Sequence, residues 1–292
     1  MKDRIVAGRY RLERMLGEGA SGRVYLARDT KERGAVWAVK ELDYTALPLN
    51  EVEEARQLFA REAELLKRLN HPSLPSVVDH FRVDERDYLV MERVEGPTLE
   101  KILADRTEPL PESRVWTIGL GLLKTLDYLH RRNPPIIYRD LKPANVMVAM
   151  NGEVKLVDFG IARVVMPQKA GDTTAYGTPG YAPPEQYQGR TSPASDIYAL
   201  GMTLMRAATL YDPPEFKFTH PGAIELNSGL SAALGETLDQ MISKEADQRP
   251  STGRLIPFFE AACEMSPSGA EVTVMLRKSW RKIKKLWSKG SK

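Results

Sequence analysis

The chain has 292 residues, of which 42% are hydrophobic and 28% charged, which is typical of globular proteins and unlike disordered or collagen-like chains. Its length suits one large core or two smaller ones, its single cysteine excludes an intramolecular disulfide, and no Cys/His cluster predicts a zinc site. The formal net charge is +3, but residues 270–292 hold eight Lys or Arg against one Glu, so the rest of the chain is net acidic and no nucleic-acid partner is expected.

The N-terminal part of the chain is rich in strand signals. Short β-like runs alternate with turn-forming glycines, which predicts an antiparallel meander followed by one helix and two more strands. The expected strands cover 10–16, 23–27, 36–42, 76–83 and 88–94, and the expected helix covers 51–69 with Asn50 as its N-cap.

Beyond the Gly-Pro pair at 96–97 the pattern changes to long helices, notably 112–131 and 195–208. We therefore predict an α+β protein with two lobes. Residues 1–94 would form a small antiparallel sheet with one main helix, and 95–265 a larger, mostly helical lobe. Residues 266–292 would form a separate tail.

Between the first two expected strands lies the sequence GEGASGRV, which begins at Gly17 and includes Gly19 and Gly22. A glycine hairpin between strands lets backbone N–H groups approach phosphate oxygens, because no Cβ blocks them. The strand on each side argues against a dinucleotide fold, in which such glycines open a helix. Alone, the pattern is weak evidence, because an ordinary glycine-rich turn is the more common case.

A buried ion pair is predicted from helical spacing. Glu62 falls on the same helix face as Phe59 and Leu66, whereas Glu64 falls on the polar face. A carboxylate on an apolar face needs a cationic partner. Lys40, which ends an apolar strand, is the best candidate, although a strand-edge lysine with its amine in solvent is the more common case.

The segment YRDLKPAN, Tyr138 to Asn145, resembles the catalytic loop of the eukaryotic-like (Hanks-type) protein kinases. The resemblance covers residues 10–263 and implies an ATP- and magnesium-dependent protein kinase, with manganese as an alternative metal. It implies that Asp140 deprotonates the substrate hydroxyl, Lys142 neutralises the transferred phosphoryl group, and Asn145 binds a magnesium ion.

Further motifs extend the resemblance. Asp158, in DFG, would bind the other magnesium, and Lys40 would hold the nucleotide phosphates. The segment GTPGYAPPE resembles the end of the family's activation loop, and it implies that Thr178 contacts Asp140 and Lys142, as in serine/threonine kinases. By the same resemblance Arg249 pairs with Glu185, and Asp196 binds the catalytic-loop backbone; a helix N-terminal acid is the simpler reading of Asp196.

Two regulatory features follow from the resemblance. Arg139 beside Asp140 implies a basic pocket for a phosphothreonine, and we predict autophosphorylation at Thr174, with Thr173 second. Tyr138 replaces the family's usual histidine, which leaves the control of the DFG segment open. Tyrosine here, together with APPEQ, resembles bacterial members.

The resemblance also implies a nucleotide pocket, although ordinary core packing is the common role of each apolar residue taken alone. Its residues would be Leu16, Gly17, Gly19, Gly22, Val24, Ala38, Lys40, Met91, Glu92, Val94 and Met147. In this set Met91 would lie at the rear, and the backbone of 92–94 would face the adenine.

The tail has the pattern of a basic amphipathic helix, because Trp280, Ile283 and Trp287 recur at helical spacing among lysines and arginines. Residues 276–289 would bind an anionic membrane surface or an acidic partner, or form a linker. A chain without an apolar leader or an 18-residue apolar stretch is expected to be cytoplasmic, here at the inner membrane face.

Two other functions compete with a protein kinase. A pseudokinase scaffold usually lacks one of Lys40, Asp140, Asn145 or Asp158, and this chain has all four. Small-molecule phosphotransferases of related fold lack the peptide-docking segment around Thr178. Protein substrates are therefore expected, and the sequence leaves a dimer open.

Overall fold

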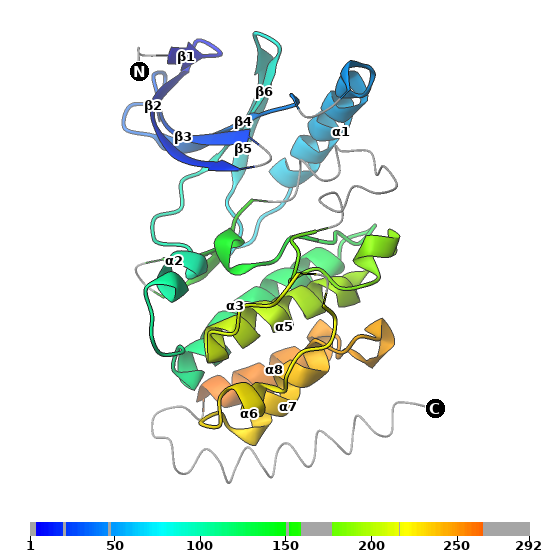
Figure 1. Cartoon of the computed structure of the whole chain (residues 1–292). Helices are drawn as coiled ribbons and strands as arrows, with labels where there is room; N and C mark the ends of the chain where they lie inside the picture. The colour runs from blue at the N-terminus through cyan, green and yellow to red at the C-terminus, as the bar shows by residue number, and fades with distance from the viewer. Residues whose placement is uncertain are drawn as a thin grey trace. The chain divides into compact units, whose positions relative to one another are not determined.

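The computed structural model of the chain describes residues 4–19, 22–45, 48–149, 152–158, 177–215 and 217–264 (Figure 1). The predicted phosphosites, the Phe-Gly of DFG and the tail lie outside these residues. Among the described helices, none is long and apolar enough to span a membrane.

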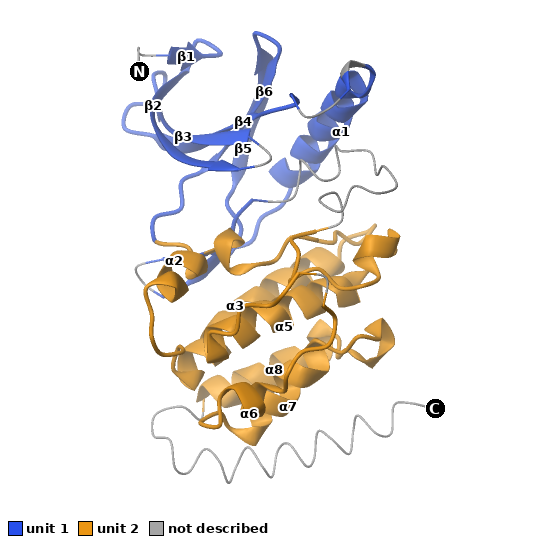
Figure 2. Cartoon of the chain, viewed as in Figure 1, with its two compact units in different colours: residues 1–96, 147–175 blue, residues 97–146, 176–292 orange. Residues whose placement is uncertain are grey.

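The chain forms two compact units (Figure 2). The first contains Met1–Gly96 together with Met147–Ala175, and the second contains Pro97–Val146 together with Tyr176–Lys292. The division near Glu95 coincides with the Gly-Pro pair. In contrast to the predicted lobes, Met147–Ala175 groups with the first unit. The reason is that residues 155, 156 and 158 contact residues of the N-terminal part of the chain, as described below.

The first unit is built on a six-stranded antiparallel sheet with the order β1-β2-β3-β4-β6-β5. Its strands are β1 (Arg4–Val6), β2 (Tyr10–Gly19), β3 (Gly22–Asp29), β4 (Val36–Leu42), β5 (Val77–Val83) and β6 (Arg86–Glu92). The predicted strands are confirmed, while β1 was missed because three residues give too short a pattern for alternation to be recognised.

Helix α1 (Leu49–Lys67) packs its apolar face against the same sheet. Ala55, Phe59 and Leu66 are buried as the spacing predicts. The predicted Asn50 cap is wrong: Pro48 precedes the helix with extended backbone, and its carbonyl accepts the Glu51 N–H at 2.9 Å. Proline fixes φ near −65°, so the helix begins directly after it.

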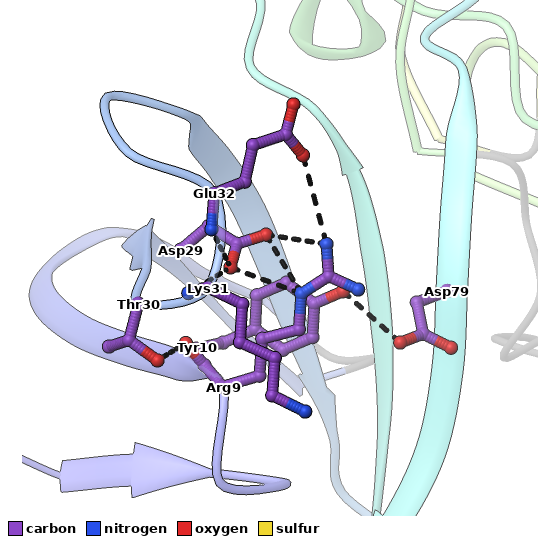
Figure 3. A network of polar contacts seen from close by, with 7 residues as sticks. All are labelled: Arg9, Tyr10, Asp29, Thr30, Lys31, Glu32 and Asp79. Atoms are coloured by element: carbon purple, nitrogen blue, oxygen red, sulfur yellow. Dashed lines mark hydrogen bonds and ion pairs between the residues drawn. The ribbon is translucent and has the colours of Figure 1, made fainter.

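A polar network joins the start of β2 to its neighbours (Figure 3). Arg9 donates to Asp29 from Nε, and the Asp29 carboxylate also accepts the N–H groups of Lys31 and Glu32. The Tyr10 hydroxyl donates to Asp79 at 3.1 Å. The hydrogen bonds from Arg9 are the main cause that lowers the pKa of Asp29 to about 2, against a desolvation that opposes it.

Replacing Asp29 by Asn is expected to destabilise the first unit by about 2 kcal/mol at neutral pH, the equivalent of this pKa shift. A lowered folded-state pKa means that the contribution is present above about pH 4 and is lost as pH falls through about 2. Urea unfolding of the two proteins at pH 7 and pH 3 measures this. An identical difference at both pH values would contradict the assignment.

The second unit is mostly helical. Its helices are α2 (Leu99–Ala104), α3 (Glu112–His130), α5 (Pro193–Thr209), α6 (Ala223–Leu226), α7 (Ala232–Met241) and α8 (Thr252–Glu264). Helix α3 packs against α8 and α5, and the positions predicted for its buried face, including Val115, Leu122 and Leu129, are buried. A short ribbon of β7 (Val146–Val148) and β8 (Val154–Leu156) follows the catalytic-loop segment in the sequence and, from Met147 on, belongs to the first unit.

Candidate active site

The glycine hairpin joins β2 to β3, as predicted. At Gly22 the backbone has φ +125°, and a Cβ would lie 2.0 Å from the carbonyl oxygen of Glu41. Glycine is therefore required there for the hairpin to approach β4. A Cβ added at Gly17 or Gly19 would meet no atom within 4 Å, so nothing in the described part of the protein demands glycine at these two positions.

Lys40 lies in the middle of the sheet, opposite Val24 on β3 and Leu89 on β6, and is only 3% exposed. Its ammonium group forms an ion pair with Asp158. Lys40 makes no ion pair with Glu62 in the described structure, which differs from the predicted pairing. The Asp158 carboxylate satisfies the buried ammonium in place of Glu62, whose Oε2 is also buried.

Residues expected around the adenine occupy adjacent positions of the same sheet. Ala38 lies opposite Leu26 and Met91, and Val24 lies opposite Gly17. Leu16 is 37% exposed on β2. The Glu92 N–H donates to the Ser76 carbonyl at 2.8 Å.

Strand β7, which carries Met147, lies close to Gly96, two residues after the segment 92–94. A Cβ at Gly96 would lie 2.2 Å from the carbonyl oxygen of Val148, and Gly96 has φ +141°. The close approach therefore depends on glycine.

In the second unit the catalytic-loop side chains form one connected group. The Thr178 hydroxyl donates to Asp140 Oδ1 at 2.7 Å, and Lys142 Nζ donates to Thr178 Oγ1 at 2.7 Å. Lys142 Nζ also lies 3.3 Å from Asp140 Oδ2. The predicted contact of Thr178 with both residues is confirmed.

Asn145 completes this group. It lies in the 3-10 turn Pro143–Asn145, and its amide nitrogen donates to the backbone carbonyl and to Oδ2 of Asp140, at 2.8 and 3.0 Å. Because both donors of the amide are used in this way, the side-chain oxygen is the atom left to face a cation. Asn145 is 6% exposed, so its orientation is held by the surrounding protein.

The backbone before Asp140 is anchored by Asp196 at the start of α5. Its carboxylate accepts the N–H groups of Tyr138 and Arg139 at 2.9 and 2.8 Å, and lies 2.7 Å from His130 Nε2. Asp196 is fully buried. Arg139 has φ +70°, which is strained for a side chain of this size and persists only when neighbours hold it. The predicted binding of Asp196 to the catalytic-loop backbone is confirmed.

Gln186 holds the other side of the same strained residue, and the sequence analysis missed it. Its amide nitrogen donates to the Arg139 carbonyl at 2.9 Å, and Gln186 is 5% exposed. Gly177, with φ +141°, makes room, because a Cβ there would lie 2.5 Å from the Gln186 amide nitrogen. No spacing or charge pattern marks a glutamine for such a role.

Replacing Gln186 by Met is expected to lower kcat about tenfold, because the peptide next to Asp140 loses one of its two anchors. The KM for ATP should change less than twofold. Gln188→Met, at an exposed glutamine whose side chain is bonded only to Arg190 among the described residues, is the matched control. Steady-state kinetics of both variants test this, and equal kinetics would refute the role of Gln186.

Glu185 and Arg249 form the predicted ion pair, with nitrogen-to-oxygen distances of 2.6 and 3.0 Å. The Arg249 side chain is fully buried and that of Glu185 is 13% exposed. Arg249 also donates to the carbonyls of Ser243, Ala194 and Lys244. The pair therefore fixes the segment after Thr178 to the helical core.

These fold and site features define a protein kinase domain, and comparison with known proteins agrees. The Protein kinase domain family matches residues 10–258, so the chain belongs to the protein kinase family. It is 40% identical over 221 residues to a probable serine/threonine-protein kinase of Streptomyces coelicolor, covering 72% of this chain and 31% of the relative. Its identity to the probable serine/threonine-protein kinase PknB of Lactococcus lactis is 32% over 259 residues, covering 84% and 40%.

Among solved structures, the PknI kinase domain of Mycobacterium tuberculosis is similar to this chain with a TM-score of 0.71 and 29% identity, covering 89% of this chain and 97% of that one. The kinase fold and the resemblance to bacterial Hanks-type kinases are thereby confirmed. The chain spans less than half the length of the two curated relatives named above.

Proposed function

We propose that the chain transfers the γ-phosphate of ATP to serine or threonine hydroxyls of protein substrates. The observation that carries this proposal is the group formed by Asp140, Lys142 and Thr178. A carboxylate, an ammonium and a hydroxyl within hydrogen-bond reach of one another suit the binding of a hydroxyl group beside a transferring phosphoryl group.

In this proposal Asp140 accepts the proton of the substrate hydroxyl, and Lys142 stabilises negative charge on the transferred group. Thr178 holds both side chains in register, and Asn145 and Asp196 orient Asp140 and its backbone. Lys40 would bind the nucleotide phosphates.

Each of the two proposed ligands has a donor atom of the kind that magnesium prefers. Asp158 of the first unit supplies a carboxylate that is 42% exposed, and Asn145 of the second unit supplies an amide oxygen; both are hard oxygen ligands. When bound, the metal would neutralise charge on the ATP phosphates. The remaining chemistry belongs to side chains of this protein: Lys40 orients the phosphates and Asp140 removes the proton.

The test uses radiolabelled ATP, a generic basic protein substrate and the full chain. Label that appears on serine or threonine, and only when magnesium is present, is expected. Phosphoamino-acid analysis distinguishes the alternatives, because phosphotyrosine, or no transfer to protein at all, would overturn the proposal.

We further propose that activity is regulated by autophosphorylation at Thr174, with Thr173 second. The support is the spacing of Thr174 from Thr178 and the presence of Arg139 beside Asp140. Phosphopeptide mapping of active protein tests this, and active protein modified at neither threonine would refute it.

For the tail we propose that residues 276–289 bind an acidic surface, which would place a cytoplasmic kinase at the inner membrane face or on an acidic partner. The support is the alternation of tryptophans with basic residues. Co-sedimentation with anionic liposomes but not with neutral ones is expected for membrane binding. Equal pelleting with both, or none, would remove the membrane version.

A further inference from the structure

Strand β8 leads directly to Asp158, but it pairs only with the short strand β7. The ribbon of β7 and β8 has three residues in each strand, and no third strand joins it within the described residues. A two-stranded ribbon of this size is marginal without further packing. Asp158, two residues after β8, has φ +62°, a left-handed conformation that a non-glycine residue keeps only when its surroundings enforce it.

Two contacts made by residues that precede Asp158 connect β8 to residues 1–96 of the first unit. The Leu156 N–H donates to the Ser73 carbonyl at 2.9 Å, and Lys155 forms an ion pair with Glu92 at the end of β6. The Lys155 side chain is 17% exposed. Together with the Lys40–Asp158 pair, these contacts explain why Met147–Ala175 groups with the N-terminal sheet.

Glu92 also has contacts of its own, independent of Lys155. Its Oε2 accepts the Ser76 N–H at 3.3 Å, and its own N–H donates to the Ser76 carbonyl at 2.8 Å. Strand β6 lies inside the sheet between β4 and β5, and the carboxylate at its end accepts the Ser76 N–H although the Glu92 side chain is 36% exposed.

We propose that the Glu92–Lys155 ion pair is a positioning device that couples the adenine-facing segment to the metal-binding aspartate. This inference rests on the proposed function, because it assigns nucleotide to Glu92–Val94 and magnesium to Asp158. Neither side chain touches the reacting atoms. The pair acts by holding β8, and therefore Asp158, at a set distance from the segment that begins at Glu92.

The inference predicts a magnesium-specific defect. In Lys155→Met, the affinity for ADP with magnesium should fall about five- to tenfold, because Asp158 is displaced, while the affinity for ADP without magnesium should change less than twofold. Glu92→Gln, which keeps an acceptor for the Ser76 N–H, should behave in the same way. The double variant should be no worse than either single one, since both remove the same pair.

The experiment measures binding of a fluorescent ADP analogue to the full chain, with and without magnesium, for wild type, both single variants and the double variant. Glu64→Gln with Lys67→Met removes an exposed pair on α1 and is the matched control, with no expected change. Hydrogen exchange of residues 152–158 in the nucleotide-free protein supplies a second readout. Faster exchange at Leu156 in Lys155→Met is expected.

Losses that add in the double variant, or equal losses with and without magnesium, would overturn the inference, as would unchanged affinity in both single variants. A wild type that binds magnesium and ADP but transfers no phosphate would remove the proposed function alone. A wild type that binds no nucleotide would overturn both.

Discussion

Replacing Asp140 by Asn is expected to lower the rate of phosphoryl transfer by about 10²- to 10⁴-fold, the range attributable to a general base. The amide oxygen keeps an acceptor for the Thr178 hydroxyl. The amide nitrogen in place of Oδ2 loses the hydrogen bond from Asn145, whose side chain still donates to the backbone carbonyl of residue 140. What is lost is the basic carboxylate and its attraction for Lys142, which lies 3.3 Å away.

The measurement is transfer of radiolabel from ATP under saturating substrate, paired with ADP binding. Nucleotide affinity should stay within about threefold of wild type, because Asp140 is assigned to the hydroxyl and not to the nucleotide. Asp127→Asn is a matched control, since this acid contacts Arg131 and Thr252 in the helical unit. Comparable transfer by Asp140→Asn and wild type would refute the assignment of the base.

Replacing Arg249 by Met is expected to destabilise the second unit by about 3–5 kcal/mol, because it leaves the carboxylate of Glu185 buried without its cation. The change also removes donors to three backbone carbonyls. Glu185→Gln leaves the fully buried Arg249 without its anion, so a loss of similar size, about 3–5 kcal/mol, is expected, offset in part by the three backbone carbonyls that still accept from Arg249. Urea unfolding at neutral pH compares the three proteins.

The pH dependence provides a separate check of the same pair. Burial is the largest single influence and raises the pKa of Glu185, but the hydrogen bonds and charge of Arg249, together with a backbone N–H and the Ser195 hydroxyl, outweigh it, so the net pKa lies below the ordinary value of 4.5. The stabilisation is therefore complete above about pH 4.5 and is lost as pH falls through the lower folded-state pKa. The gap in unfolding free energy between wild type and Glu185→Gln should shrink in acid. A gap that widens would contradict the pairing.

Two sets of polar contacts could be predicted from the resemblance to a family, although not from spacing. They are the ion pair of Arg249 with Glu185 and the contacts of Thr178, and the structure contains both. The apolar face of α1 followed from its 3.6-residue period alone.

Other contacts could not be predicted, for identifiable reasons. Lys40 had two suitable carboxylates in the sequence, and the choice of Asp158 over Glu62 depends on where segments 118 residues apart are brought together. Gln186 and Lys155 are ordinary polar residues in sequence. Their roles become visible only in the structure, where Gln186 bonds to the strained backbone of Arg139 and Lys155 connects the short strand β8 to Glu92.

The sequence by itself determined the kinase family, the types of side chain available for phosphoryl transfer, and the alternation of strands and helices, because each depends on residue identity and local periodicity. Only the tertiary structure decided which charges neutralise one another and which polar groups anchor Arg139 and Asp158. Those choices depend on distance and burial in three dimensions, where several partners of equal chemistry compete and packing selects one.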